Sequence, residues 1–157
     1  MKRAFLLLAG LSVAAASASA AASTSTTSRV PTAHDSRAVK IQLRRIEVGK
    51  VLVDGSGFTL YRFSKDPRNT DMCVKISGCT NLWPPVKTSG RPVAGAGVRA
   101  SLLSTIKLPG GSRQVTYAGH PLYRYAASTE AGETSYIGAS QFGGSWFAVN
   151  AAGGSVK

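Results

Sequence analysis

The sequence predicts an all-β protein built from two similar hairpin units, folded as a small antiparallel meander sandwich or an open barrel with at most one short helix. A short aromatic phrase occurs twice in the chain. Breaks of hairpin length that contain glycine separate runs of β-favouring residues. After Gly49, no stretch keeps a helical hydrophobic period over more than about two turns. These observations leave sandwich and open barrel equally open.

The duplicated phrase is TLYRFSKD at residues 59–66 and PLYRYAAS at residues 121–128. Around these phrases, VLVDGSGFTLYRFSKD aligns with RQVTYAGHPLYRYAAS, and further on NLWPPV aligns with GSWFAV after a slip of one residue. We therefore predict two repeat units, at about residues 51–86 and 113–149. We expect them to pack together, because a single hairpin has too little apolar area to be stable alone.

Side chains alternate along a strand, so each aromatic phrase should present its rings on one face. These rings are Tyr61, Phe63, Tyr123 and Tyr125. Alternating aromatic residues usually serve packing, because each buried ring supplies a large apolar area. We expect the same structural role for Trp83 and Trp146, which close the two units, and a ligand platform is the alternative for the four rings.

The links between the units contain further local signals. Pro109-Gly110-Gly111 predicts a third hairpin in LLSTIKLPGGSRQVTYA. Pro84-Pro85 predicts an edge or a turn, because proline has no N–H for a central strand. The best helical stretch is GVRASLLSTI at residues 97–106.

The start of the chain has the pattern of a secretory signal peptide at residues 1–20: a basic beginning, an apolar run and small residues before a cleavage point. Residues 21–46 follow as a flexible basic leader, since their polar part offers little apolar surface to offset the entropy of ordering. We predict the two-repeat β domain at residues 47–150 and a tail at 151–157. No cysteine lies near the cleavage point, so we expect a secreted or periplasmic protein without a lipid anchor or a transmembrane span.

The chain is strongly basic, with a formal net charge of +12. Removal of Lys2 and Arg3 with the signal peptide leaves +10, of which +4 falls on residues 21–50 and +6 is scattered over the domain. A nucleic-acid-binding protein usually concentrates its charge into a stripe, so we expect no specific nucleic acid. An anionic envelope component or another exported protein is a possible partner, because basic proteins attract such partners without specificity. The oligomeric state is not predicted.

Cys73 and Cys79 predict a disulfide, because an exported chain meets an oxidising compartment. The alternative is a soft-metal site that would add Met72 and His120. Adjacent residues point in opposite directions on a strand, which separates Met72 from Cys73. We predict no metal and no cofactor.

Four motifs, in order, resemble those of a bacterial family of secreted proteins and predicted lipoproteins whose repeat has no known function. YRFSKD is similar to the family's Y-x-(F/W/Y)-x-x-D phrase, and CVKISGCTNLWPPV to its two cysteines followed by Trp-Pro-Pro. RQVTYAGHPLYRYAAST and GGSWFAV resemble the opening and the close of its second copy. The resemblance covers about residues 47–150 and implies fold and compartment but no activity. Two features depart from it: the lipid-attachment cysteine is absent, and the second copy ends with Ala127-Ser128 where an acid is common.

No residue is identified as catalytic from the sequence. There is no Gly-x-Ser-x-Gly elbow, and the disulfide would remove the free thiols that cysteine catalysis needs. Asp66 precedes a proline and is typical of a turn acid that accepts backbone N–H groups, with a ligand contact as the alternative. His120 lies in a tight turn and is typical of a hydrogen-bonding surface residue. The weak ligand-binding candidates are Tyr61, Phe63, Asp66, His120, Tyr123 and Tyr125.

The predicted function is a secreted, envelope-associated β module, without catalysis, that binds a cell-wall, glycan or protein partner. One alternative is an accessory to extracytoplasmic redox or metal traffic through Met72, His120 or the cysteine pair. A less favoured alternative is an exported hydrolase that pairs Asp66 with Glu130 or Glu133, which would need two acids held in one cleft.

Overall fold

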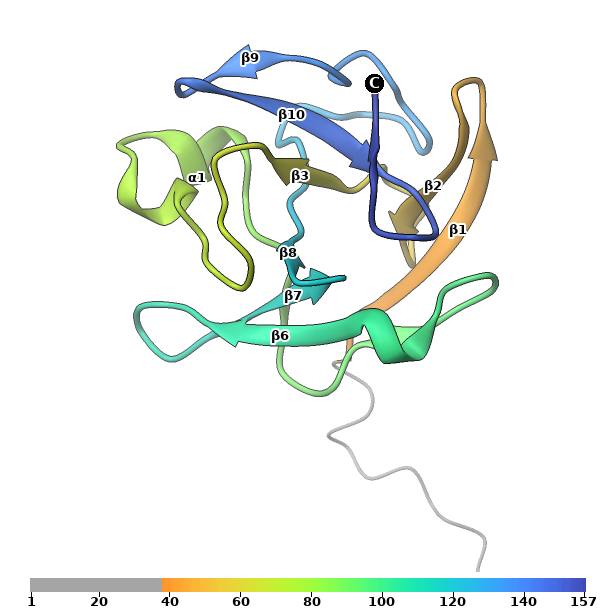
Figure 1. Cartoon of the computed structure of the whole chain (residues 1–157), viewed down its shortest axis with the longest axis horizontal. Coiled ribbons are helices and arrows are strands. Elements are labelled where there is room, and N and C mark those ends of the chain that lie inside the picture. Colours follow the sequence, from red (N-terminus) through yellow and green to blue (C-terminus); the bar gives the residue numbers. More distant parts are fainter. Residues whose placement is uncertain (1–37) are drawn as a thin grey trace, which may run out of the picture. The chain divides into compact units, whose positions relative to one another are not determined.

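A computed structural model describes residues 38–157 (Figure 1). The expected signal peptide and residues 21–37 of the expected leader lie outside the described residues. The strands are β1 (Lys40–Ile46), β2 (Gly49–Asp54), β3 (Tyr61–Phe63), β4 (Lys87–Thr88), β5 (Val93–Ala94), β6 (Leu103–Lys107), β7 (Arg113–Tyr117), β8 (His120–Pro121), β9 (Ser140–Gln141), β10 (Gly144–Val149) and β11 (Ser155–Val156). One short α-helix, α1 (Cys79–Leu82), follows a 3₁₀ turn at Cys73–Lys75, and a second 3₁₀ turn spans Ala100–Leu102.

The described strands form three sheets. One has the order β2-β1-β5, the second β11-β10-β3 with β9 beside β10, and the third β4-β7-β6 with β8 beside β7 (Figure 1). All strand pairs are antiparallel except β1 with β5. The all-β prediction is confirmed, and no sheet among residues 38–157 closes into a barrel.

The hairpins fall where the glycine-containing breaks predict them. The chain after β2 turns back through a bridge between Val53 and Thr59. β6 and β7 pair over their whole length around the Pro109 turn. β7 and β8 are joined by Ala118 and Gly119, with φ of 50° and 79°. A two-residue hairpin turn of this kind needs positive φ at both positions, which glycine adopts at no steric cost.

The two repeats are interlocked by strand pairing. Tyr61 and Tyr123 exchange backbone hydrogen bonds, from Tyr61 N–H to Tyr123 O (3.0 Å) and from Tyr123 N–H to Tyr61 O (2.9 Å). On its other side Tyr61 pairs with Ala148, and Tyr123 pairs with Pro85. Ala148 and Pro85 are equivalent positions in the repeat alignment. Each aromatic strand is therefore paired with the closing segment of the other repeat, so each repeat completes the other.

Side chains on the two faces of the aromatic strands enter different parts of the core. Leu60 and Leu122 point into an aliphatic cluster with Ile41, Leu52 and Val115. The aromatic cluster contains Tyr61, Phe63, Cys73, Cys79, Trp83, Tyr123 and Trp146, all fully buried. The period-2 alternation of the duplicated phrase thus sends its leucines one way and its rings the other.

A stacked pair of tryptophans lies at the centre of the aromatic cluster. The rings of Trp83 and Trp146 are 4.0 Å apart and 2° from parallel. Tyr61 meets Trp83 edge-on and Tyr123 meets Trp146 edge-on, each at 5.1 Å. Phe63 stacks on Trp146 at 4.3 Å. Such ring pairs add about 0.5–1.5 kcal/mol each beyond their buried area, and the expected packing of the two aromatic faces is observed.

Three segments differ from the sequence expectation. Residues 40–46, expected within the flexible leader, form β1 and pair along their length with β2. Ile41 is buried in the core, whereas the neighbouring Arg44 and Arg45, on opposite faces of the strand, are both exposed. Residues 103–106 of the best helical stretch belong to β6, and the expected tail contributes β11, which pairs with β10. Pairing with a neighbouring strand outweighs local composition in each case.

Candidate functional site

The predicted aromatic ligand residues lie mainly inside the protein. Tyr61, Phe63 and Tyr123 are fully buried among the tryptophans. Tyr125 is half-buried and its ring contacts Trp83 (4.8 Å) and Tyr136 (3.6 Å). A ligand could reach the first three rings only if the cluster opened. These rings therefore serve the packing of the core.

Asp66 is buried at the end of the first aromatic phrase, with 7% of its surface exposed. Its Oδ1 accepts the Met72 N–H (2.8 Å) and its Oδ2 accepts the Tyr123 hydroxyl (2.7 Å). Burial raises the pKa of Asp66 to about 6, against the opposing effect of these two hydrogen bonds, which favour the carboxylate. The expected backbone contact of a turn acid is present. Its contact with the tyrosine of the other repeat was not expected.

A second buried acid, Asp71, lies beside this contact. Its Oδ1 accepts the Val74 N–H (2.9 Å) and so holds the start of the 3₁₀ turn that carries Cys73. The charge of Asp71 contributes to the raised pKa of Asp66. Burial, followed by the charges of Asp66 and Asp71, raises the pKa of Tyr123 as well, so this hydroxyl stays protonated and donates.

His120 lies at the β7–β8 turn and is half-buried. Burial lowers its pKa, and the nearby Arg62 and Arg68 lower it further by charge repulsion. The charge of Arg62 also lowers the pKa of Asp66, against the larger effect of burial. The structure therefore brings both His120 and Asp66 near one arginine, Arg62, which was not among the residues predicted to form a site.

The acids of the hydrolase alternative occupy different surroundings. The backbone oxygen of Glu133 accepts the hydroxyls of Thr59 (2.8 Å) and Tyr61 (3.4 Å). Glu130 is exposed. Asp66, by contrast, is enclosed with Tyr123 and Asp71. These contacts do not give the open cleft between two acids that glycoside hydrolysis requires.

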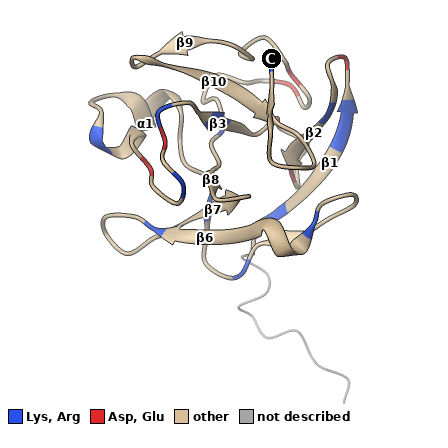
Figure 2. Cartoon of the chain, viewed as in Figure 1, with Lys and Arg blue, Asp and Glu red and all other residues tan. Residues whose placement is uncertain are grey.

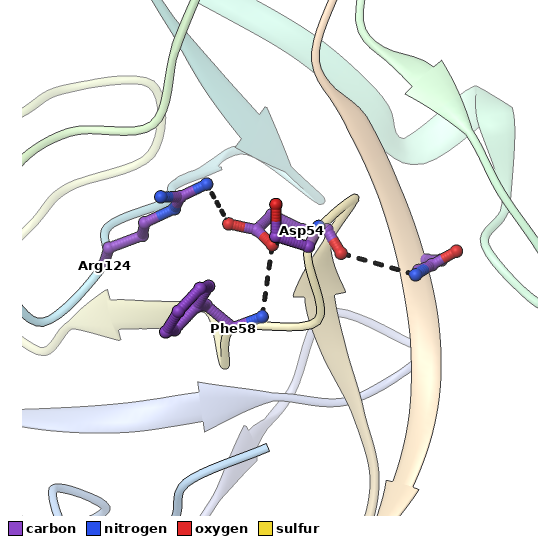
Figure 3. Close-up of polar contacts among 5 residues, drawn as sticks. Asp54, Phe58 and Arg124 are labelled. Carbon is purple, nitrogen blue, oxygen red and sulfur yellow. Dashed lines mark hydrogen bonds and ion pairs between the residues drawn. The ribbon is translucent and has the colours of Figure 1, made fainter. Parts of the chain in front are cut away.

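Asp54 and Arg124 form an ion pair between the repeats (Figure 3). Asp54 is fully buried, and its Oδ1 accepts the N–H groups of Ser56 (2.8 Å) and Phe58 (3.1 Å). The Arg124 guanidinium pairs with Oδ2 and lies 5.6 Å from the centre of the Phe58 ring. The backbone oxygen of Asp54 also accepts the Gln42 side chain (3.4 Å). The cluster is a cross-link that joins β1, the first hairpin and the second aromatic phrase.

The cysteines form the predicted disulfide. Cys73 and Cys79 are bonded and fully buried, beside the tryptophan pair. Within residues 38–157, no group of three or more His, Cys, Asp or Glu side chains is placed to hold a metal ion. The redox and metal alternative therefore has no exposed thiol to use in this part of the chain.

A basic face lies on the third sheet and the loop that follows β4. Arg91, Arg113, Ser104 and Thr105 line an open pocket of about 450 Å³. A second pocket of about 460 Å³ is lined by Lys87 and again by Arg113. Neither lining contains an Asp or Glu. We call Lys87, Arg91 and Arg113, which are all exposed, the basic face.

The charge of the domain is therefore less evenly scattered than expected. Residues 72–129 contain seven Lys or Arg and no Asp or Glu. Figure 2 shows the result: Lys and Arg, without acids, along β6 and the loops beside it. This acid-free stretch is visible in the sequence. The net charge of the whole domain does not reveal this stretch, because the acids lie before and after it.

A family model described as a secreted repeat of unknown function matches residues 45–87 and 104–150. The two matches together cover more than half of the chain. The chain belongs to this family. Membership in the secreted-repeat family agrees with the two interlocked units and is consistent with an extracytoplasmic location. No curated protein and no solved structure matches the chain.

The match to the secreted-repeat family ends close to the boundaries of the interlocked strands. It leaves out residues 88–103, which hold Arg91 and the loop that follows β4. Within residues 38–157, no helix is long and apolar enough to cross a membrane.

Proposed function

We propose that this secreted repeat protein is a non-catalytic module that binds an anionic polymer of the cell envelope through its basic face. The observation that carries the proposal is the pair of adjoining pockets that share Arg113 and contain Lys87 and Arg91 without an acid. Cationic side chains without neighbouring acids raise the local concentration of polyanions and speed their association. The sequence offered both the aromatic rings and the basic residues as possible contacts for a partner. Because most of these rings are buried in the core, the basic face is the surface that we propose for binding.

The proposed ligand is a polymer with one negative charge per unit, such as a chain of glycerol phosphate. The two pockets are open and lie side by side, since Ser89 and Arg113 line both. Such a surface suits successive charges of an extended chain better than one enclosed small molecule. Arg113 donates to the Thr105 hydroxyl (3.1 Å), which fixes its guanidinium at the junction of the pockets.

The test compares two triple variants with the same loss of charge. Lys87, Arg91 and Arg113 are changed to Gln in one, and the exposed Arg45, Lys50 and Lys157 are changed to Gln in the other. Affinity for a glycerol phosphate oligomer is measured by isothermal titration calorimetry at a fixed salt concentration. A Lys or Arg near an anionic surface contributes about 1 kcal/mol, so the first variant should bind roughly 100-fold more weakly.

The control variant should bind within about threefold of the unchanged protein, because its charges lie away from the pockets. Equal losses in the two variants would mean that only net charge matters, and the proposal would then be wrong. No binding by the unchanged protein at low salt would also reject it. Dextran, a neutral glycan, should bind none of the three proteins.

A further inference from the structure

The repeat places two equivalent arginines, Arg62 and Arg124, at the centre of its two aromatic phrases. Each faces the hairpin of the opposite repeat. Arg124 lies over Phe58, and Arg62 lies near His120, which aligns with Phe58. The two guanidinium groups thus occupy equivalent positions but have different neighbours.

Arg124 has a built-in counter-ion, and the equivalent position beside Arg62 does not. Asp54, which pairs with Arg124, donates its N–H to Phe58 O (3.0 Å) across its hairpin. The residue that pairs with His120 across the second hairpin is Tyr117. Its hydroxyl is engaged elsewhere, with the Ala151 oxygen (2.9 Å) and the Arg99 N–H (3.2 Å). Tyr117 thus replaces the carboxylate and contributes no charge to Arg62.

Two polar atoms at this place are buried without a hydrogen-bond partner among the described residues: Arg62 Nε and His120 Nδ1. A buried polar group without a partner costs about 1–3 kcal/mol, and native proteins nearly always satisfy such groups with protein, water or ligand. Their counterparts at the first site do not share this problem, because Asp54 serves Arg124 and Phe58 has no polar atom in its side chain. The second site has the donors but lacks the acceptor.

A third cation is held at the same place. The Asn69 N–H donates to the Gly119 oxygen (2.7 Å), which fixes the loop after β3 against the β7–β8 turn. The Arg68 guanidinium lies so close to Gly119 that a Cβ there would be 2.9 Å from its terminal nitrogen. β3, which carries Arg62, lies against β8, which begins at His120. After burial, the charges of Arg62 and Arg68 both lower the pKa of His120, in agreement with this placement.

The two acids near this cluster bind other groups. The charges of Asp66 and Arg62 attract each other, but the two oxygens of Asp66 accept hydrogen bonds from the Tyr123 hydroxyl and the Met72 N–H. Asp71, whose charge contributes to the raised pKa of Asp66, accepts the Val74 N–H through Oδ1, and its Oδ2 has no hydrogen-bond partner among the described residues. Neither carboxylate forms an ion pair with an arginine among the described residues.

We propose that Arg62, Arg68 and His120 form a binding site for a single oxyanion of the size of phosphate or sulfate. The anion occupies the place that the Asp54 carboxylate holds in the first repeat. It accepts from the unpaired Arg62 Nε, from the Arg68 guanidinium and from the His120 ring, which binds as the imidazolium. Guanidinium groups suit such anions because their planar donors match pairs of oxygens. The site is separate from the basic face and goes beyond the proposed function.

The experiment follows the two histidine rings of the chain by NMR. His34 serves as the internal reference for His120. The pH titration is recorded in sodium phosphate and in sodium chloride at equal ionic strength. A bound phosphate stabilises the imidazolium, so phosphate should raise the pKa of His120 and leave that of His34 unchanged.

Two variants identify the residues that bind the anion. Arg68→Gln is exposed and should fold normally, and it should weaken phosphate binding about tenfold, because hydrogen bonds to charged groups are the strong ones. Arg45→Gln removes an exposed charge elsewhere and should bind as the unchanged protein does. His120→Phe copies the first repeat and should abolish binding while keeping the near-ultraviolet circular dichroism of the aromatic core.

The proposal is overturned if the pKa of His120 is the same in phosphate and chloride, which would assign the unpaired atoms to ordered water. It is also overturned if Arg68→Gln and Arg45→Gln weaken binding equally. Neither result bears on the basic face, because Lys87, Arg91 and Arg113 remain unchanged in all these proteins.

Discussion

Raising the pH from about 4 to about 7 should lower the free energy of unfolding through one residue, Asp66. Burial raises the pKa of this carboxyl from its ordinary value of 3.8 to about 6. Between these values the folded protein holds a proton that the unfolded chain has lost, so stability falls as the pH rises. The difference of pKa corresponds to a loss of about 3 kcal/mol over this window.

The variant that isolates this effect is Asp66→Asn. An amide keeps one acceptor for the Met72 N–H and offers its NH₂ group to the Tyr123 oxygen, and it does not titrate. Urea unfolding, followed by tryptophan fluorescence, gives the free energy of unfolding of both proteins at a series of pH values. The unchanged protein should lose about 3 kcal/mol relative to the variant between pH 4 and pH 7.

Glu130→Gln, at an exposed acid, is the matched control and should show the pH dependence of the unchanged protein. The reasoning fails if the stability difference between the unchanged protein and Asp66→Asn is constant with pH. It fails equally if the unchanged protein gains stability relative to that variant as the pH rises, since the pKa of Asp66 would then be lowered by folding.

Three further predictions concern the stability of the fold: two test contacts between the repeats, and one tests the disulfide within the first repeat. Trp146→Ala removes one half of the stacked pair and should cost about 3–5 kcal/mol in urea unfolding, whereas a loss below about 1 kcal/mol would show that the stack is not central. Replacing Cys73 and Cys79 together by Ser should lower stability by about 2 kcal/mol, as expected for a loop of this length, and a reductant should then have no further effect. Arg124→Gln leaves the buried Asp54 without its cation and should cost about 2 kcal/mol, the range for a buried acceptor that loses its partner, and adding Asp54→Asn should restore part of it.

Much of the repeat architecture could be predicted from residues alone. The duplicated aromatic phrase, with its alternation of leucine and aromatic rings, fixes which side chains enter which part of the core. Glycine-containing breaks mark the hairpins because positive φ is a local requirement, as at Ala118 and Gly119. The disulfide follows from compartment and spacing.

The exchange of strands between the repeats could not be predicted. Tyr61 pairs with both Tyr123 and Ala148, positions far apart in the sequence, and local periodicity carries no information on such partners. β1 was missed for a related reason. Its exposed Arg44 and Arg45 resemble the rest of the polar leader, and the local sequence does not reveal the strand pairing and the core that bury Ile41.

The candidate sites depend on relations that only the fold provides. Arg62 and Arg124 are identical in the sequence alignment, yet one meets Asp54 and the other does not. That difference arises because the two hairpins differ in length, which places Tyr117 opposite His120. The basic face could have been predicted in part, since the sequence contains no Asp or Glu between Asp71 and Glu130.

The most direct test of the proposed function is an NMR titration of the ¹⁵N-labelled protein with a glycerol phosphate oligomer. The account predicts that the amide signals that shift first and most belong to residues 87–92 and 103–113, around Lys87, Arg91 and Arg113. Shifts centred on β1 and β2, or spread evenly over all basic residues, would contradict it.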